Sequence, residues 1–167
     1  ITTSQHHNIT TSQHHNITTS QHQTAGIYLH IPFCKQACHY CNFHFSTSMR
    51  YKSEMIDAIL TEIELQKDYL NNLPLQSIYF GGGTPSVLET SEIELLLNQI
   101  YKFHQVLPNA EITLEANPDD LTETKLQQLS DTSINRLSIG VQSFFDADLK
   151  YLNRVHDVSE AINCIKN

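Results

Sequence analysis

Short apolar runs alternate with amphipathic helical patterns along residues 26–167, and this alternation limits the fold more than any other feature. Runs rich in β-branched and aromatic residues, typical of buried strands, lie at residues 26–31, 77–80, 111–115 and 136–141. Apolar residues at helical spacing predict helices at residues 53–70, 91–103, 121–129 and 146–152. Because strand and helix alternate repeatedly, we expect an α/β fold with a parallel sheet and helices outside it.

Two of these helices have recognisable starts. Ser91 and Glu94 have the spacing of a capping box, in which two side chains satisfy free backbone amides, and Thr122 is the expected N-cap of the following helix.

A last helix is predicted at residues 157–167. No strand follows for its apolar face to cover, so we expect the chain to be an N-terminal fragment of a longer protein. That face is formed by Ala161, Ile162 and Ile165.

The first 25 residues differ from the rest in composition. They repeat an eight-residue unit, ITTSQHHN, and hold five of the ten histidines but no Asp, Glu, Lys or Arg. Such a segment cannot bury enough apolar surface to offset its loss of conformational entropy. Residues 1–25 are therefore predicted to be a disordered His-rich tail, and residues 26–167 one domain that is truncated at its C-terminus.

The charge and hydropathy of the chain exclude two classes of partner. The 18 acidic and 10 basic residues all lie in residues 26–167 and give a net charge of −8. Nucleic acid is an unfavourable partner for such a chain, since phosphate binding wants a basic face. No apolar run approaches the roughly 18–20 residues of a membrane span, so no transmembrane segment is expected.

Unusual polar residues and glycines follow each predicted strand directly. Three cysteines come after the first strand, Gly-Gly-Gly-Thr-Pro after the second, and Ala-Asn-Pro after Glu115 at the end of the third; the fourth runs into Gly-Val-Gln-Ser. The carboxyl ends of parallel strands meet at one edge of a sheet, where the sites of such folds lie. The four loops are therefore predicted to share one pocket.

The cysteines Cys34, Cys38 and Cys41 form a C-x3-C-x2-C pattern that suits a metal or an iron–sulfur cluster. Structural zinc needs four protein ligands, and His44 has a spacing that would allow it to be the fourth. A [4Fe–4S] cluster normally takes four cysteines, so three leave one iron open to a substrate or cofactor. We favour the cluster and keep zinc as the alternative. Cys164 is expected to be a buried helical thiol.

The glycine run at residues 81–83 lies between a strand and a helix. Glycines there let a ligand approach the backbone and offer amides to a carboxylate or amine, although a tight turn explains them as well. No lysine follows, which argues against a nucleotide-triphosphate loop. Glu115, Gln142 and Arg154 together would supply an acceptor for an ammonium or ribose, an amide for ribose hydroxyls and a guanidinium for a carboxylate. That set suits an amino-acid nucleoside.

Four sequence segments carry a family resemblance in the same order along the chain. The segments are Tyr-x-His-Ile-Pro-Phe-Cys at residues 28–34, Gly-Gly-Gly-Thr-Pro, Glu-Ala-Asn-Pro, and Arg-Leu-Ser-Ile-Gly-Val-Gln-Ser-Phe at residues 136–144. Together they resemble the oxygen-independent coproporphyrinogen III oxidase family of radical S-adenosylmethionine (SAM) proteins. The resemblance implies a TIM-like partial (β/α)6 barrel, of which this chain supplies about four βα units. It also implies that the three cysteines bind a [4Fe–4S] cluster, with SAM on the open iron. The implied SAM contacts are Tyr28, Tyr40, Gly82, Gly83, Thr84, Glu115, Gln142 and Arg154.

Phe43 is the main departure from the oxidases, which carry a fourth cysteine at this position. Phenylalanine there resembles the haem chaperone branch, whose members bind haem and pass it to respiratory haem proteins. We therefore expect a haem chaperone with haem as cargo, and oxidative decarboxylation of coproporphyrinogen is expected to be absent. An oxidase that decarboxylates propionates is the alternative, and a zinc-binding interaction module is the third hypothesis. His156 is a further candidate residue in the chaperone. An oxygen-sensitive cluster implies a reducing cytoplasm.

Overall fold

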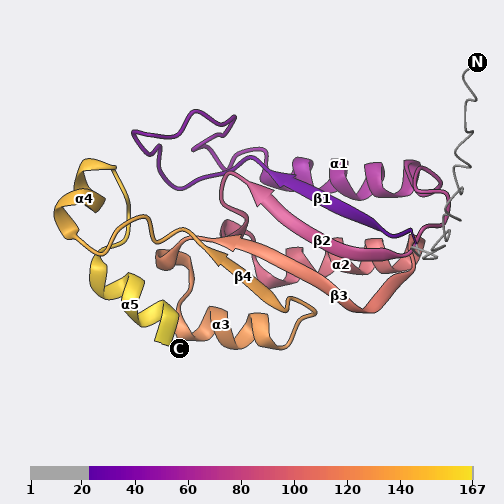
Figure 1. Ribbon diagram of the computed structural model, residues 1–167. Helices are drawn as coiled ribbons and strands as arrows, with labels where there is room; N and C mark the ends of the chain where they lie inside the picture. Colours follow the sequence, from indigo (N-terminus) through magenta and orange to yellow (C-terminus); the bar gives the residue numbers. More distant parts are fainter. Residues whose placement is uncertain (1–22, 167) are drawn as a thin grey trace, which may run out of the picture.

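The computed structural model describes residues 23–166, which form one parallel four-stranded sheet with helices (Figure 1). The strands are β1 (Ala25–Ile31), β2 (Leu75–Gly82), β3 (Val106–Ala116) and β4 (Arg136–Ile139), in the order β1-β2-β3-β4. Each neighbouring pair is parallel, with Leu29 opposite Phe80 and Glu115 opposite Ser138. The predicted α/β fold with a parallel sheet is confirmed.

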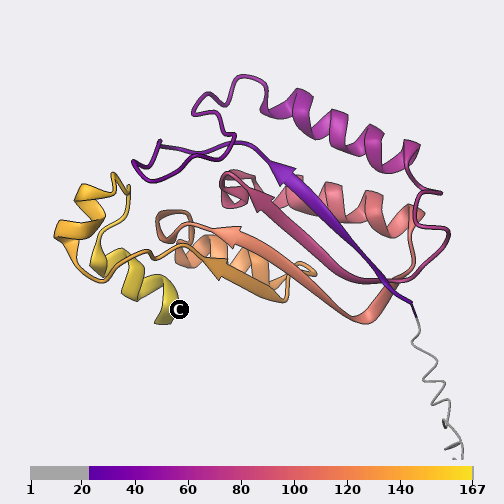
Figure 2. The same cartoon turned by 45° about the horizontal axis from the view of Figure 1, so that its top comes forward.

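Three helices cover one face of this sheet (Figure 2). They are α1 (Lys52–Leu65), α2 (Thr90–Phe103) and α3 (Glu123–Ser130), and each links one strand to the next. Two short 3₁₀ turns, η1 (Pro85–Val87) and η2 (Pro118–Asp120), follow β2 and β3. Beyond the carboxyl end of β4 lie α4 (Asp146–Tyr151) and α5 (Val158–Lys166). Because the four strands are parallel, their carboxyl ends lie together at one edge of the sheet.

The core lies between the sheet and its helices. Side chains alternate along β1, so that Leu29 and Ile31 are buried while Tyr28 and His30 are exposed on the opposite face. From the helical side, α2 buries its apolar stripe against the strands. This stripe consists of Ile93, Leu96, Leu97 and Ile100. A sheet covered by helices on one face only is what the wall of a βα barrel requires.

Several predicted helix boundaries are wrong, for local reasons. The first helix ends at Leu65 and not at residue 70, and turns follow it up to Asn71 and Asn72, which have φ of 49° and 60°. The capping box of α2 is formed by Glu89 and Glu92 and not by the predicted pair. Ser91 lies inside that helix. The predicted N-cap of α3 is confirmed, since Thr122 Oγ1 accepts a hydrogen bond from the Lys125 amide at 3.2 Å.

The two ends of the described segment also differ in detail from the prediction. The tail predicted at residues 1–25 lies outside the described residues up to residue 22, and Ala25 is already part of β1. In α5, Ala161 and Cys164 are buried, whereas Ile165 is 55% exposed, so the predicted apolar face is partly wrong. The expectation of a buried helical thiol at Cys164 is confirmed. Within residues 23–166, no helix has the length and apolar character needed to span a bilayer.

Candidate functional site

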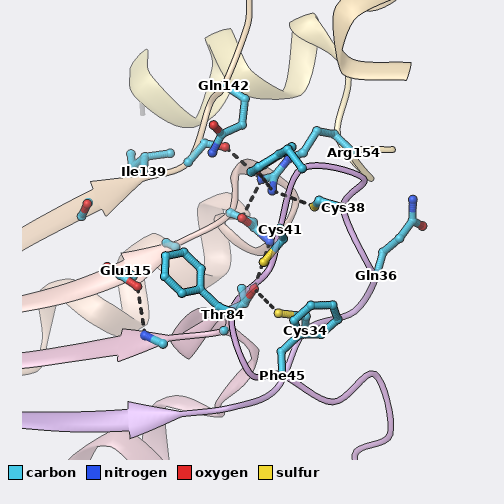
Figure 3. Close-up of a pocket in the computed structure, with 18 residues that line it drawn as sticks. Cys34, Gln36, Cys38, Cys41, Phe45, Thr84, Glu115, Ile139, Gln142 and Arg154 are labelled. Carbon is cyan, nitrogen blue, oxygen red and sulfur yellow. Dashed lines mark hydrogen bonds between the residues drawn. The ribbon is translucent and has the colours of Figure 1, made fainter. Parts of the chain in front are cut away.

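A cavity of about 290 Å³ lies at the carboxyl ends of the strands. All four strand-end loops contribute to it, as predicted, and Arg154 joins them from the segment after α4. Figure 3 shows the three cysteines, Thr84, Glu115, Gln142 and Arg154 around this space. The parallel topology therefore brings together residues that are more than a hundred positions apart in the sequence.

The cysteine loop is held in place from both ends. On the β1 side, the Cys34 amide donates to the Ser46 carbonyl at 3.0 Å, and the Ser46 amide donates to Pro32 at 2.7 Å. On the other side, the loop is tied to the segment after α4: the His39 amide donates to the Leu152 carbonyl at 3.1 Å. Backbone hydrogen bonds to two other parts of the chain therefore position the loop.

Two of the three sulfurs already accept hydrogen bonds. Thr84 Oγ1 donates to Cys34 Sγ at 3.4 Å, and Arg154 Nη1 donates to Cys38 Sγ at the same distance. Burial raises the pKa of the Cys34 thiol, and the hydrogen bond from Thr84 opposes this effect. Such donors favour the thiolate form, which is the form that ligates metals.

Three cysteines supply the metal-ligating groups of the cavity. Cys34, Cys38 and Cys41 are all half-buried and all line the cavity. Cysteine thiolates are the ligands that hold iron–sulfur clusters in proteins. The chemistry of this donor set therefore suits an iron–sulfur cluster.

The glycine run allows β1 to lie close to the loop after β2. A Cβ at Gly83 would be 2.7 Å from the Phe33 carbonyl oxygen and 3.0 Å from Cys34 Sγ. At Gly82, where φ is +114°, a Cβ would be 2.8 Å from the ring of His30. Side chains at these two positions would therefore push the cysteine loop and the end of β1 away.

The amides of this run are not free, and the prediction that they are offered to a ligand is wrong. The Gly83 amide donates to Ile31 at 2.8 Å and the Thr84 amide to Phe33 at 2.7 Å. The Gly82 amide donates to Glu115 Oε2 at 3.2 Å. The tight-turn explanation therefore accounts for the amides, although Gly82, Gly83 and Thr84 all line the cavity.

Glu115 is held by two donors at the rim of the cavity. Besides the Gly82 amide, Tyr79 Oη donates to Glu115 Oε1 at 2.7 Å. That hydrogen bond, together with burial and the carboxylate charge, raises the pKa of Tyr79. Tyr28 stacks on Tyr79 with ring centroids 5.8 Å apart and is 58% exposed. Tyr28 is not among the residues that line the cysteine cavity, and it lies on the sheet face opposite the helices.

Arg154 is the most connected side chain of the cavity. Its Nη1 donates to Cys38 Sγ and, at 3.3 Å, to Tyr40 Oη; its Nη2 donates to Asn117 Oδ1 at 2.6 Å and to the Gly140 carbonyl at 2.9 Å. Only Nε is buried without a partner. Among residues 23–166 it forms no ion pair with Asp148 or Asp157. Most of this guanidinium is therefore used to organise the site.

Two further predicted residues, Gln142 and His156, differ in their position relative to the cavity, and Asn117 lines the cavity although it was not predicted. Gln142 lines the cavity from a left-handed backbone conformation with φ of 66°. His156 is 2% exposed, with Nε2 3.0 Å from the Val141 carbonyl oxygen, and does not line the cavity. Sequence reasoning missed Asn117 as a site residue; its position two residues after Glu115 at the end of a strand was the available signal.

The family model of the radical SAM superfamily matches residues 28–167 of this chain. The chain therefore belongs to the radical SAM superfamily. A radical SAM domain implies a [4Fe–4S] cluster and SAM as cofactors, which agrees with the cysteine-lined cavity.

Curated relatives narrow this class further. The heme chaperone HemW of Buchnera aphidicola subsp. Acyrthosiphon pisum is 36% identical over 141 residues, which are 83% of this chain and 38% of that protein. HemW of Escherichia coli strain K12 is 34% identical over 145 residues, 84% of this chain and 38% of that protein. The chain thus spans 38% of the length of these two relatives.

A solved structure agrees in fold. Coproporphyrinogen III oxidase (HemN) from Escherichia coli, described as a radical SAM enzyme, superposes with a TM-score of 0.78 at 26% identity. The match covers 89% of this chain and 35% of HemN. It confirms the predicted N-terminal part of a TIM-like radical SAM barrel, and the relatives confirm the predicted resemblance to the haem chaperone branch of the HemN-like proteins.

Proposed function

We propose that Cys34, Cys38 and Cys41 hold a [4Fe–4S] cluster whose fourth iron is chelated by SAM in the adjoining cavity. The observation that carries this proposal is the gathering of three half-buried thiols and all four strand-end loops around one cavity of about 290 Å³. When bound, the cluster supplies an electron for reductive cleavage of the SAM carbon–sulfur bond.

The residues of the chain have distinct tasks in this proposal. Thr84 and Arg154 donate to two of the sulfurs and stabilise the ligating thiolates. Glu115, fixed by Tyr79 and the Gly82 amide, presents a carboxylate at the rim, where it is an acceptor for the amino group or the ribose of SAM. Tyr40, Gly82, Gly83 and Gln142 line the same space. Tyr28 has the least geometric support as a SAM contact, because it lies outside the cavity lining.

For the whole protein, we propose a haem chaperone that delivers haem to respiratory haem proteins. The support is the similarity to HemW proteins together with Phe43, which is 72% exposed and lines the cavity where the oxidases carry a further cysteine. The second candidate is an oxygen-independent coproporphyrinogen III oxidase, which the structural similarity to HemN supports. A reducing cytoplasm suits the proposed cluster, since an iron open to solvent is sensitive to oxygen.

The cluster can be tested by iron and sulfide analysis of the anaerobically reconstituted protein. Wild type and the control Cys164→Ala should each bind about four irons with sulfide, because Cys164 is buried in α5, away from the cavity. Cys38→Ala should lose most of this iron. Zinc without sulfide in the wild type would contradict the proposed site.

The choice between chaperone and oxidase can be made with two measurements on the full-length protein. Spectroscopic titration with haem should show saturable binding, and anaerobic incubation with coproporphyrinogen III, SAM and a reductant should give no vinyl product. Formation of the vinyl product would establish the oxidase instead.

A further inference from the structure

Asn117 connects the two donors that are aimed at cysteine sulfurs. Its Oδ1 accepts a hydrogen bond from Arg154 Nη2 at 2.6 Å, and its Nδ2 donates to Thr84 Oγ1 at 3.3 Å. Each of these partners then donates to a different sulfur, Arg154 to Cys38 and Thr84 to Cys34. One side-chain amide thus lies between two routes that end on two of the three proposed cluster ligands.

The direction of these hydrogen bonds is determined by their chemistry. A guanidinium only donates, so the amide oxygen of Asn117 must face Arg154 and the amide nitrogen must face Thr84. Because Thr84 Oγ1 accepts from that nitrogen, its own hydrogen is free to point at Cys34 Sγ. With Nη2 occupied by Asn117 and the Gly140 carbonyl, Nη1 of Arg154 is directed at Cys38. The amide therefore sets the direction of both donors.

The backbone holds Asn117 firmly in this place. Its amide donates to Ser86 Oγ at 3.2 Å, and Ser86 Oγ in turn donates to Asp120 Oδ2 at 2.5 Å. Ser86 and Asp120 are both buried. Since η1 and η2 thus anchor the residue from both sides, its side chain has little freedom to follow Arg154 or Thr84 if they move.

We infer that Asn117 is a positioning residue that keeps both sulfur donors in place and thereby raises the reduction potential of the cluster, an inference that rests on the proposed function. Hydrogen bonds to the sulfurs of a cluster are among the features that set its potential. They stabilise the reduced cluster more than the oxidised one, because reduction adds negative charge that the sulfurs share. Loss of Asn117 should loosen both donors at once and make the cluster harder to reduce.

The test is an EPR-monitored redox titration of the reconstituted protein without SAM, which reads the cluster and not turnover. Asn117→Ala should lower the reduction equilibrium constant about tenfold, a shift of ~59 mV to more negative potential for a one-electron couple. Thr84→Val should cause part of this shift. The double variant should shift by less than the sum of the two, since Asn117 acts partly through Thr84.

Asn135, which lies just before β4 and bonds to β3, offers a matched control. Its Oδ1 accepts from the Ile112 amide and its Nδ2 donates to the Ala110 carbonyl, both at 2.8 Å, and it does not line the cavity. Asn135→Ala removes two comparable hydrogen bonds and should destabilise the fold without moving the potential. An equal shift in this control would show that loss of stability, and not positioning, is responsible.

The result is distinguishable from failure of the proposed function. Absence of any cluster in the wild type overturns the proposed function itself, whereas an unchanged potential in Asn117→Ala overturns only the role of Asn117. If Asn117→Ala does not retain a cluster, Asn117→Asp serves instead, because it keeps the acceptor for Arg154 and loses the donor to Thr84. The shift in reduction potential that Asn117→Asp causes should then be smaller when Thr84 is already valine. Equal shifts with Thr84 and with Val at this position would show that Asn117→Asp acts through its added charge alone, which would overturn the positioning role of Asn117.

Discussion

Asn153 Nδ2 donates a hydrogen bond to the Ala37 carbonyl oxygen at 2.7 Å, and this contact joins the cysteine loop to the segment that carries Arg154. The contact is reciprocal, since Gln36 Nε2 donates to the Asn153 carbonyl at 2.8 Å. Asn153 has a φ of 59°, in the left-handed region that asparagine tolerates better than most residues. The loop that bears the cysteines and the arginine that donates to one of them are therefore positioned by the same residue.

Replacing Asn153 should separate the effects of its hydrogen bond and its backbone conformation. Asn153→Gly keeps the left-handed conformation and loses the hydrogen bond, so the free energy of unfolding should fall by about 0.5–1.5 kcal/mol. Asn153→Ala also has to adopt an unfavourable φ and should cost roughly 1–3 kcal/mol more. Urea denaturation of the apo protein measures both. Equal stability of the two variants would show that the backbone conformation contributes nothing.

Gly82 should be the least replaceable glycine of the run. It has a φ of +114°, and a Cβ would lie 2.8 Å from the ring of His30 and 3.2 Å from the Ile31 amide nitrogen. Gly82→Ala should therefore destabilise the fold by about 1–3 kcal/mol.

Gly140→Ala is the matched control for this prediction. The nearest atom to its added Cβ is Gln142 Nε2 at 3.1 Å, the end of a flexible side chain, so the loss of stability should be smaller. Denaturation midpoints of the two apo variants test the order. A larger loss at Gly140 would mean that local strain at Gly82 is relieved by movement of β1.

The sequence was sufficient to predict the sheet and the location of the site, because both follow from short-range patterns. Apolar runs identified the centres of all four strands, and residues placed at strand ends had to meet at one edge in a parallel sheet. Boundaries were less predictable. The helix α1 ends at Leu65 although apolar residues at helical spacing continue beyond it, and the capping box of α2 used Glu89 and Glu92 although Ser91 and Glu94 have the same spacing.

The contacts inside the site could not be predicted, because they are tertiary. Asn117, Thr84 and Arg154 lie on three different loops, and nothing in their sequence neighbourhoods shows that they bond to one another. In the same way, the glycine amides looked free until Glu115 and the end of β1 occupied them. Arg154 lines the cavity, but its hydrogen bonds are made to other groups of the protein.

Lys35 should contribute more to stability than its surface position indicates. Its ammonium group contacts Asp119 at 2.9 Å and also pairs with Asp120; the side chains of these two residues are 7% and 3% exposed, while the Lys35 side chain is 44% exposed. Lys35→Met leaves two buried carboxylates without their cation, which should cost about 1–3 kcal/mol, less than for a fully buried pair because water reaches the lysine.

The exposed pair of Arg136 and Glu111 provides the comparison for Lys35. Both side chains are about half exposed, at 52% and 54%, so Arg136→Met should cost only about 0–1 kcal/mol. Thermal unfolding of both variants in low and high salt measures the difference. Equal losses of stability in Lys35→Met and Arg136→Met would show that Lys35 does not stabilise the buried carboxylates.

The hydrogen bond between Tyr79 and Glu115 should be visible in the alkaline titration of the protein. Tyr79 Oη donates to Glu115 Oε1 at 2.7 Å, and this bond, burial and the carboxylate charge raise the pKa of Tyr79 above its ordinary value of 10.0. A raised pKa in the folded state means that the protonated phenol is stabilised by folding. This stabilisation is complete below pH 10.0 and is lost as the pH rises through the pKa of the folded state.

Glu115→Gln should bring the pKa of Tyr79 down towards its ordinary value, since the neutral amide oxygen is a weaker acceptor for the phenol and the carboxylate charge is lost. The chain has seven tyrosines, so the Tyr79 signal is isolated by subtracting the tyrosinate absorbance of Tyr79→Phe from that of its parent, with and without the glutamine. Glu94→Gln, which removes an exposed carboxylate on α2, should leave the Tyr79 midpoint unchanged. If Glu115→Gln also leaves it unchanged, the carboxylate is not the acceptor of this phenol, and Glu115 is then held at the rim of the cavity by the Gly82 amide alone.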